Sequence, residues 1–383
     1  MQVVDNELWD YFKDKISYFC LFVIVPYLRR MLRFIFLPYA YFFLVNWEEC
    51  TRTRFQVAFD FLYIFFVLKY FPDNYSLCRL WEKDRAEWIY YYGSNYDPYQ
   101  RRQLRKEVQK KEYFILFEDK NICYQLCQAG GLPLPKQYGF ASGSDDIKKC
   151  LSYIFKNNPD DKVIVKPTLG KGGKGICLCS MKEGQFFVRS TSSEGQLEEF
   201  GDNIPAVLQK YITQHEELTA ISPSTNTVRL ATLLTKNNNV LIIGAKLRLG
   251  VGNSFVDNSS KGGISVGINT QLGALLTWGQ DFNSLKYERH PTSQIKFKDF
   301  KIPMWQEVVA LAEATQRHFS YFKLLGHDIA ITSDGPVIIE LNAIYDNVAL
   351  ELASGPILNN KSVLMAYYEY GLLINSKQRK LCI

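Results

Sequence analysis

The sequence predicts an α+β protein with antiparallel sheets, preceded by an aromatic-rich helical region. From about residue 112 onward, β-rich segments follow one another at short intervals, and short polar turns such as 236–239 separate them. Short turns join antiparallel neighbours, because parallel strands need a long crossover. The first 111 residues instead contain long apolar, aromatic segments, in a chain with 26 Phe and 24 Tyr.

Composition narrows the class of protein. Apolar residues make up 47% of the 383 positions and charged residues 22%, which suits a globular core. The net charge of +6 is too small to indicate a nucleic-acid partner. The nine cysteines lack the spacing of a zinc site, and reduced thiols that fill a core are typical of a cytoplasmic protein.

The N-terminal region, 1–111, contains three uncharged apolar stretches at 16–28, 34–47 and 61–68, and arginines follow the first. None has the roughly 20 apolar residues that cross a bilayer, and no basic segment marks a secretory signal. Two interpretations stay open. The helices lie at the inner face of a membrane with the arginines toward anionic head groups, or they pack against a core of their own.

The elements of the remaining chain follow from periodicity and turn residues. A helix is expected at 114–128, where Gly130 and Gly131 end it, and prolines then force an extended turn. Strands are expected at 162–167, 175–180, 185–190, 206–212, 227–235, 240–249, 264–269, 328–332 and 337–341. Helices are expected at 304–322 and 361–373. The expected boundaries are 1–111, then 112–205 with a glycine-rich loop, then 206–383 with a metal site.

A glycine-rich loop follows the strand at 162–167, which carries Lys166. The loop contains Gly170, Gly172, Gly173 and Lys174. Glycines let backbone amides approach phosphate oxygens that a Cβ would block, and a strand-borne lysine adds a point charge. The loop matches neither a Walker A motif nor a dinucleotide fingerprint. The alternative is a tight hairpin with exposed lysines.

Three oxygen-bearing side chains, those of Asp328, Glu340 and Asn342, predict a metal site. The turn at 332–336 would place Asp328 and Glu340 side by side on antiparallel strands, and Asn342 points the same way as Glu340. Such groups are unfavourable in apolar strands unless a cation such as Mg²⁺ binds them. The alternative is a polar face of a half-exposed strand.

Arg229 lies in an otherwise apolar strand, where a guanidinium usually meets a phosphate or a carboxylate, or else forms an internal ion pair. A second glycine-containing loop, 257–263, carries Lys261 and either closes over a substrate or is simply mobile. His215 and His327 are expected to be packing residues, and no catalytic base is assigned.

The order of these features resembles the ATP-grasp superfamily, and more narrowly the sugar-transfer-associated ATP-grasp family, which is related to α-L-glutamate ligases. The similarity covers about 112–370 and implies two α+β lobes with antiparallel sheets that grip ATP. By resemblance, Lys120 and Lys166 hold the phosphates and Glu217, or Glu216, holds the ribose. The residues expected to contact the adenine are Gln209, Lys210, Tyr211 and Ile212.

The resemblance also implies that Asp328, Glu340 and Asn342 hold two Mg²⁺ ions, with Mn²⁺ as the alternative metal. Arg229, Arg248 and Lys261 would act near the γ-phosphate and the acyl group. The implied activity is an ATP-dependent carboxylate–amine ligase that forms an acyl phosphate, in cell-surface polysaccharide biosynthesis at the inner face of the membrane. Its substrates would be a small carboxylate and an amine, one of them sugar-linked. A small-molecule kinase and a non-catalytic nucleotide-binding adaptor at the membrane are the alternatives.

Overall fold

The computed structural model describes residues 12–13, 15–17, 19–20, 24–94, 97–170, 172–182, 184–190, 194–196, 205–252 and 262–383. The chain forms two compact units. The first contains the described residues up to Lys110, together with Asp346–Leu352 and Pro356–Ile383. The second contains Lys111–Tyr345 and Ala353–Gly355. The expected second lobe ran to residue 383, whereas most residues after Tyr345 cluster with the N-terminal helices.

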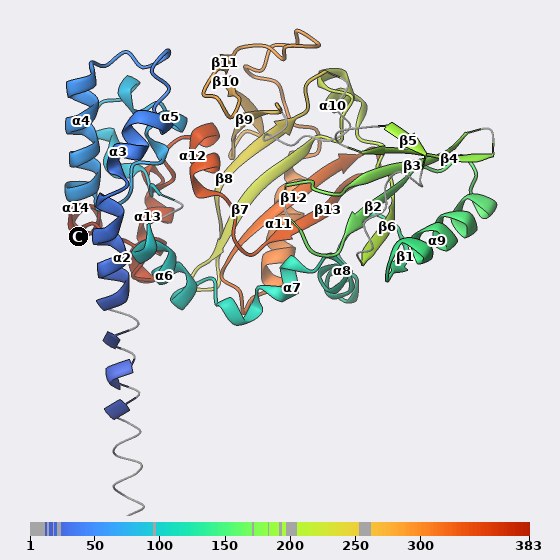
Figure 1. Ribbon diagram of the computed structural model, residues 1–383, viewed down its shortest axis with the longest axis horizontal. Coiled ribbons are helices and arrows are strands. Elements are labelled where there is room, and N and C mark those ends of the chain that lie inside the picture. The colour runs from blue at the N-terminus through green and yellow to red at the C-terminus, as the bar shows by residue number, and fades with distance from the viewer. Residues whose placement is uncertain are drawn as a thin grey trace, which may run out of the picture. The chain divides into compact units, whose positions relative to one another are not determined.

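The first unit is helical (Figure 1). Its N-terminal elements are α2 (Val25–Phe34), α3 (Leu37–Tyr39), η2 (Ala40–Leu44), α4 (Arg54–Leu62), η3 (Tyr63–Leu68), α5 (Asn74–Leu77), η4 (Leu80–Glu82), η5 (Glu87–Tyr90) and α6 (Pro98–Glu107). Its C-terminal elements are α12 (Asn347–Ser354), η9 (Ile357–Asn359), α13 (Lys361–Glu369) and α14 (Ser376–Lys380). Tyr75 packs edge-on against Phe61 and Trp88 in a buried aromatic core. The aromatic-rich helical N-terminal region is therefore confirmed, and part of it forms a core of its own.

A six-stranded sheet forms the first half of the second unit. Its strands are β1 (Gln137–Ala141), β2 (Val163–Pro167), β3 (Cys177–Lys182), β4 (Gln185–Ser190), β5 (Glu194–Gln196) and β6 (Ala206–Lys210), in the order β1-β6-β2-β3-β4-β5. Every described neighbour in it is antiparallel. Helix α9 (Ser144–Asn157) packs on β1 and β6. The sequence predicts neither β1 nor α9, and β6 joins this sheet although the expected boundary placed it in the second lobe.

A seven-stranded antiparallel sheet forms the other half. Its strands are β7 (Thr227–Leu234), β8 (Val240–Leu249), β9 (Ile264–Asn269), β10 (Ala274–Gln280), β11 (Lys286–Tyr287), β12 (Leu324–Thr332) and β13 (Gly335–Asn342), in the order β11-β10-β9-β8-β7-β12-β13. Helix α11 (Trp305–His318) packs on β7, β12 and β13, and α10 (Glu216–Ile221) precedes the sheet in the chain. Two antiparallel sheets with covering helices confirm the α+β class (Figure 1).

The helix expected at 114–128 is two helices, α7 (Ile115–Glu118) and α8 (Lys120–Ala129). The break falls at Asp119, whose carboxylate accepts hydrogen bonds from the N–H groups of Asn121 and Ile122 and so caps α8. Lys120 is consequently the first residue of a helix and not an interior one. In the described part of the chain, no helix combines the length and the apolar composition that a bilayer crossing requires.

Candidate nucleotide and metal site

A pocket in the second unit brings together side chains from both sheets. Lys166 of β2 and Gln209 of β6 come from the first sheet, Glu340 of β13 comes from the second, and Lys120 comes from α8. Its apolar walls include Phe117, Tyr124, Leu134 and Ile338. Four residues that the sequence selects from segments up to 220 positions apart therefore line one cavity with two cations and one carboxylate.

Lys120 links the glycine-rich loop to the second sheet. Its Nζ donates a hydrogen bond to the carbonyl oxygen of Gly170 at 3.1 Å and lies 3.8 Å from Glu340 Oε1. Its backbone N–H donates to the carbonyl of Thr168 at 2.9 Å. The capped start of α8 thus holds this amine at the edge of the loop, where it can meet an anion.

Lys166 is a cation that has lost much of its hydration. The pKa of Lys166 is lowered to about 8, and burial is the largest cause. Lys120 also lowers it, whereas the carboxylates of Glu340 and Asp328 raise it. A desolvated ammonium gains more from a bound anion than a hydrated one does, because the local dielectric constant is low. The lysine is therefore suited to binding a phosphate.

The loop after β2 uses its glycines for their backbone conformation. Gly170, Gly172, Gly173 and Gly175 have φ angles of 138°, 71°, 72° and 72°, in the region that residues with a Cβ rarely adopt. Lys174 is exposed on this loop. The loop is thus a chain reversal that depends on glycine, and it presents backbone groups beside Lys120.

Asp328 and Glu340 are register partners on β12 and β13, as the sequence predicts. Asp328 is buried and accepts two hydrogen bonds from Arg229, from Nε at 2.6 Å and from an Nη at 2.5 Å. Arg248 lies 3.3 Å from the same carboxylate. Burial raises the pKa of the Asp328 carboxyl. The positive charges of Arg229 and Arg248 have the larger, opposite effect and lower this pKa to about 2. Both arginines thus form the internal ion pair that the sequence left open.

The residues expected to bind metal suit a hard cation. The Glu340 side chain retains 32% of its accessible surface, and among the described residues nothing accepts a hydrogen bond from the buried side-chain nitrogen of Asn342. Carboxylate and amide oxygens are ligands that Mg²⁺ accepts. No three His, Cys, Asp or Glu side chains within the described ranges cluster closely enough to hold a metal. Asn342, water and phosphate oxygens would therefore have to complete the set.

Residues 99–365, more than half of the chain, match the family model for sugar-transfer associated ATP-grasp proteins. The chain belongs to this family. No curated protein sequence matches it. Solved structures to which the chain is similar include phosphoribosylamine–glycine ligase from Thermotoga maritima, at 13% identity and TM-score 0.42, and biotin carboxylase from Campylobacter jejuni, at 14% identity and TM-score 0.41. The matches cover 68% and 69% of this chain and 56% and 48% of those chains.

A third solved structure, the ADP complex of N5-carboxyaminoimidazole ribonucleotide synthetase, matches at 12% identity and TM-score 0.37. It covers 64% of this chain and 48% of that one. This ATP-grasp chain thus spans about half the length of each of the three. Membership of the family rests on the family model, which includes both sheets and the pocket between them.

Gln209 lines the pocket of this ATP-grasp protein and is the first of three side-chain amides connected by hydrogen bonds. Its Nε2 donates to Gln137 Oε1 at 3.3 Å, and Gln137 Nε2 donates to Asn121 Oδ1 at 3.0 Å. The remaining oxygen, Gln209 Oε1, is buried and accepts no hydrogen bond from the described residues. A fixed, unsatisfied acceptor at a ligand pocket favours a ligand with an N–H group.

The segment after Gln209 offers fewer backbone donors than the sequence suggests. The N–H groups of Lys210 and Tyr211 already donate to the carbonyls of Lys136 and Lys162, at 2.8 and 2.7 Å. The Lys210 ammonium lies 2.8 Å from Asp161. Ile212 N–H makes no hydrogen bond within the described part of the chain, so it is the backbone donor of this segment that remains for a base.

The other expected site residues lie elsewhere or outside the described residues. Glu216 and Glu217 are exposed in the first turn of α10, where His215 Nδ1 accepts from the Glu217 N–H at 3.3 Å. Lys261 lies outside the described residues. His327 bonds to Thr232 Oγ1 at 2.7 Å, and burial lowers its pKa to about 3. It is a neutral packing residue, as the sequence predicts.

Sequence reasoning missed one cation. Lys246 is buried in β8, is the register partner of Arg229 and contributes to lowering the pKa of Asp328. A lysine in the otherwise apolar stretch that precedes Arg248 is the signal that could have identified it, by the same reasoning that selected Arg229. Three cations on β7 and β8 thus act on the carboxylate of Asp328.

Proposed function

We propose that this protein is an ATP-dependent carboxylate–amine ligase that works through an acyl phosphate. The observation that carries the proposal is the pocket in which Lys120 and Lys166 meet Glu340. Cations beside a glycine-rich loop suit the phosphates of ATP, and a carboxylate with an amide two residues further along the strand suits the metal that accompanies it. Membership of the ATP-grasp family supports the same assignment.

Each residue has a defined contribution in this proposal. Lys120 and Lys166 neutralise phosphate oxygens, and Gln209 Oε1 together with the Ile212 N–H would bind the amino and ring-nitrogen edge of adenine. Glu217, or Glu216, would hold the ribose. Asp328, Glu340 and Asn342 would hold Mg²⁺, as two ions, with Mn²⁺ as a substitute. Bound Mg²⁺ would supply neutralisation of the charge on the phosphates.

The chemistry needs positioning and charge more than a nucleophilic side chain. A substrate carboxylate oxygen attacks the γ-phosphorus and ADP leaves. An amine nitrogen then attacks the acyl carbon, inorganic phosphate leaves and a proton passes to solvent. The guanidiniums of Arg229 and Arg248, beside Asp328, would stabilise negative charge on the transferring phosphoryl group. Lys261 is proposed to act over the acyl group.

The description of the family suggests the class of substrate. Since the chain belongs to a family named for its association with sugar transfer, we propose that the carboxylate or the amine is sugar-linked. The setting would be cell-surface polysaccharide biosynthesis in the cytoplasm at the inner face of the membrane. A kinase that phosphorylates a hydroxyl group at the same site is the second candidate, because the same cations would serve it.

The test is Mg²⁺-dependent ADP release by the purified protein with pairs of amines and sugar-linked carboxylates. Release that requires both partners establishes the ligase. Hydroxylamine in place of the amine gives a hydroxamate from an acyl phosphate, whereas a phosphorylated hydroxyl group gives none, so this readout separates the ligase from the kinase. ATP binding without release for any pair supports a non-catalytic nucleotide-binding adaptor and contradicts the ligase.

A further inference from the structure

An apolar stripe runs along the outside of the helix formed by α4 and η3 in the first unit. Its members are Phe55, Phe59, Leu62 and Phe66, each between 41% and 79% exposed. Their spacing of four, three and four residues places them on one helical face. Three exposed phenylalanines in one row are unusual for a surface that meets only water.

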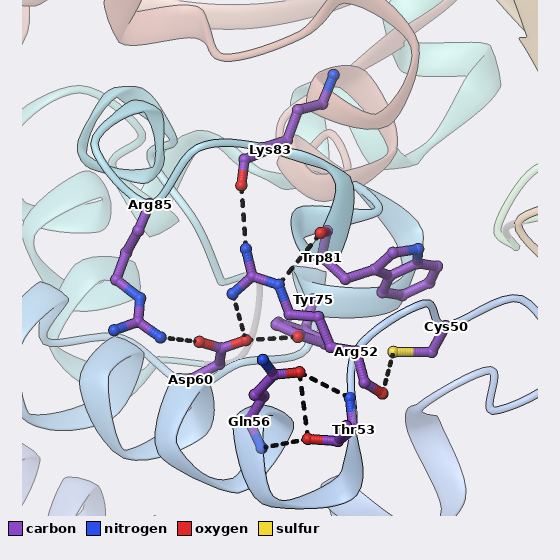
Figure 2. A network of polar contacts seen from close by, with 9 residues as sticks. All are labelled: Cys50, Arg52, Thr53, Gln56, Asp60, Tyr75, Trp81, Lys83 and Arg85. Carbon is purple, nitrogen blue, oxygen red and sulfur yellow. Dashed lines mark hydrogen bonds and ion pairs between the residues drawn. The ribbon is translucent and has the colours of Figure 1, made fainter.

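The opposite face of this helix is fixed to the unit. Phe61, Ile64 and Leu68 are buried in the aromatic core. Asp60, fully buried between them, accepts hydrogen bonds from Arg52 at 2.8 Å, from Tyr75 at 2.7 Å and from Arg85 (Figure 2). Because the carboxylate is held by two guanidiniums and a phenol, the helix cannot turn without breaking buried charged contacts. The apolar stripe is therefore held outward.

Helix α2 exposes most of its apolar residues, whereas two of its three arginines contact the rest of the unit. An exposed face combines Tyr27, Leu28, Met31, Leu32 and Ile35. Arg30 instead donates to the Phe65 carbonyl at 2.7 Å and lies 3.6 Å from Asp97, and Arg33 stacks 5.9 Å from the Phe71 ring centroid. A surface helix of a water-soluble protein usually buries its apolar side and exposes its arginines.

The apolar stripe on α4 and η3 adjoins the exposed apolar residues of α2. The rings of Phe34 and Phe66 lie 5.7 Å apart, which connects α2 to η3. Between these helices in the chain, Phe36, Tyr39, Phe42 and Phe43 are also exposed, and Tyr41 OH donates to the Arg54 carbonyl at 3.1 Å. The exposed apolar residues of 27–66 are called the apolar face below.

We propose that the apolar face docks in the plane of an anionic lipid bilayer, with its aromatic side chains among the acyl chains nearest the head groups. This inference deepens the location given under the proposed function. Arg29 and Arg54 are exposed beside the face, as is the single acidic residue Glu48, whereas Asp60 and Glu49 are neutralised by arginines. The balance of charge around the face suits anionic head groups, and lipid chains can cover an apolar surface of any shape.

The experiment is flotation of the full chain with phosphatidylcholine vesicles and with mixed phosphatidylcholine–phosphatidylglycerol vesicles. A triple variant, Phe43→Ser, Phe55→Ser and Phe59→Ser, replaces exposed rings and should leave the fold intact. Tyr153→Ser is the matched control, because Tyr153 is an equally exposed aromatic residue on α9 in the other unit. We expect binding to mixed vesicles, a loss of about tenfold for each replaced phenylalanine, and no change in the control.

Three results would overturn the inference: no flotation of the wild-type chain with either vesicle, equal flotation of the triple variant, or self-association that the triple variant abolishes. The last result would assign the face to a second copy of the chain. ATP binding, measured on the same samples, separates the two proposals. A wild-type chain that binds ATP but neither vesicle rejects only the docking face, and a wild-type chain that binds mixed vesicles but no ATP rejects only the nucleotide site.

Discussion

Asp328 and Glu340 lie opposite each other on β12 and β13, yet their surroundings differ sharply. Asp328 is buried and bound to Arg229 and Arg248, whereas Glu340 is partly exposed and has Lys120 at 3.8 Å. Two carboxylates that face each other repel unless cations intervene. The arginines therefore stabilise the facing carboxylates, and Glu340 is the one that remains accessible, as the proposed metal site requires.

Glu340→Gln is expected to abolish metal-dependent turnover. The amide keeps the shape of the side chain but removes the charge that attracts a hard cation. We expect the rate of Mg²⁺-dependent ADP release to fall by about 10²-fold or more. Chelation of the metal should reduce the wild-type rate to the level of the variant. Glu307→Gln, at an exposed position on α11, is the control, and a variant with wild-type ADP release would contradict the metal assignment.

Arg229→Met is expected to destabilise the fold of the second unit. Asp328 would stay buried with one of its two closest cations missing, and breaking a buried pair typically costs about 3 kcal/mol. Combining it with Asp328→Leu should recover part of the loss, because the buried carboxylate is then gone, while Arg248 and Lys246 lose the charge that they share. Urea unfolding of the single and double variants measures the free energy lost in Arg229→Met and the part of it recovered in the double variant. Additive losses in the double variant would show that the pair is not coupled.

Lys166 should give ATP binding a pH dependence in the free protein. With the pKa of Lys166 lowered to about 8, the ammonium loses its charge as the pH rises through that value, and its attraction for phosphate is lost. The Kd for ATP should increase by about tenfold per pH unit above about pH 8. Lys166→Arg keeps its charge, so its titration calorimetry profile should be flat. Lys174→Arg should retain the wild-type profile, and an unchanged profile in Lys166→Arg would exclude this role.

The spacing of residues could predict that Asp328 and Glu340 face each other, but not which cations surround them. Asp328 and Glu340 are twelve residues apart across one hairpin, so local geometry places them side by side. Arg229 meets Asp328 only because β7 lies beside β12, and the two residues are 99 positions apart. Nothing in the local sequence selects that neighbour over a phosphate. Lys246 could have been selected from its apolar stretch, but not its proximity to Asp328, which depends on the register of β7 with β8.

Helix ends and edge strands were harder to predict for a different reason. The break at Asp119 depends on a carboxylate that caps the next helix, and Asp119 lies in a polar run, 118–121, that could equally form the exposed face of one continuous helix. Strand β1 contains Gly139 and is half-buried, so it lacks the alternation that marks a strand. The α+β class was easier to predict, because the short turns between β-rich segments are too short for the crossover that parallel strands require and so favour antiparallel pairing.

Glu351 should make the stability of the first unit depend on pH. It accepts hydrogen bonds from the N–H groups of Tyr92 and Gly93 at 2.7 and 3.2 Å, and burial raises its pKa to about 8. A carboxyl group with a raised folded-state pKa contributes stability that is complete below its unfolded pKa, near 4.5, and is lost as the pH rises through about 8. The free energy of unfolding should therefore fall across this interval, by up to about 5 kcal/mol.

Glu351→Gln removes the titrating group and should flatten this pH dependence, because the side chain then stays neutral in both the folded and the unfolded state. Urea unfolding at several pH values between about 5 and 8 measures the slope. Glu369→Gln, at an exposed position on α13, should keep the wild-type slope. If the slope of Glu351→Gln equals that of the wild type, the proton on Glu351 is not linked to folding. The donors of Tyr92 and Gly93 would then hold a carboxylate that is ionised throughout the interval.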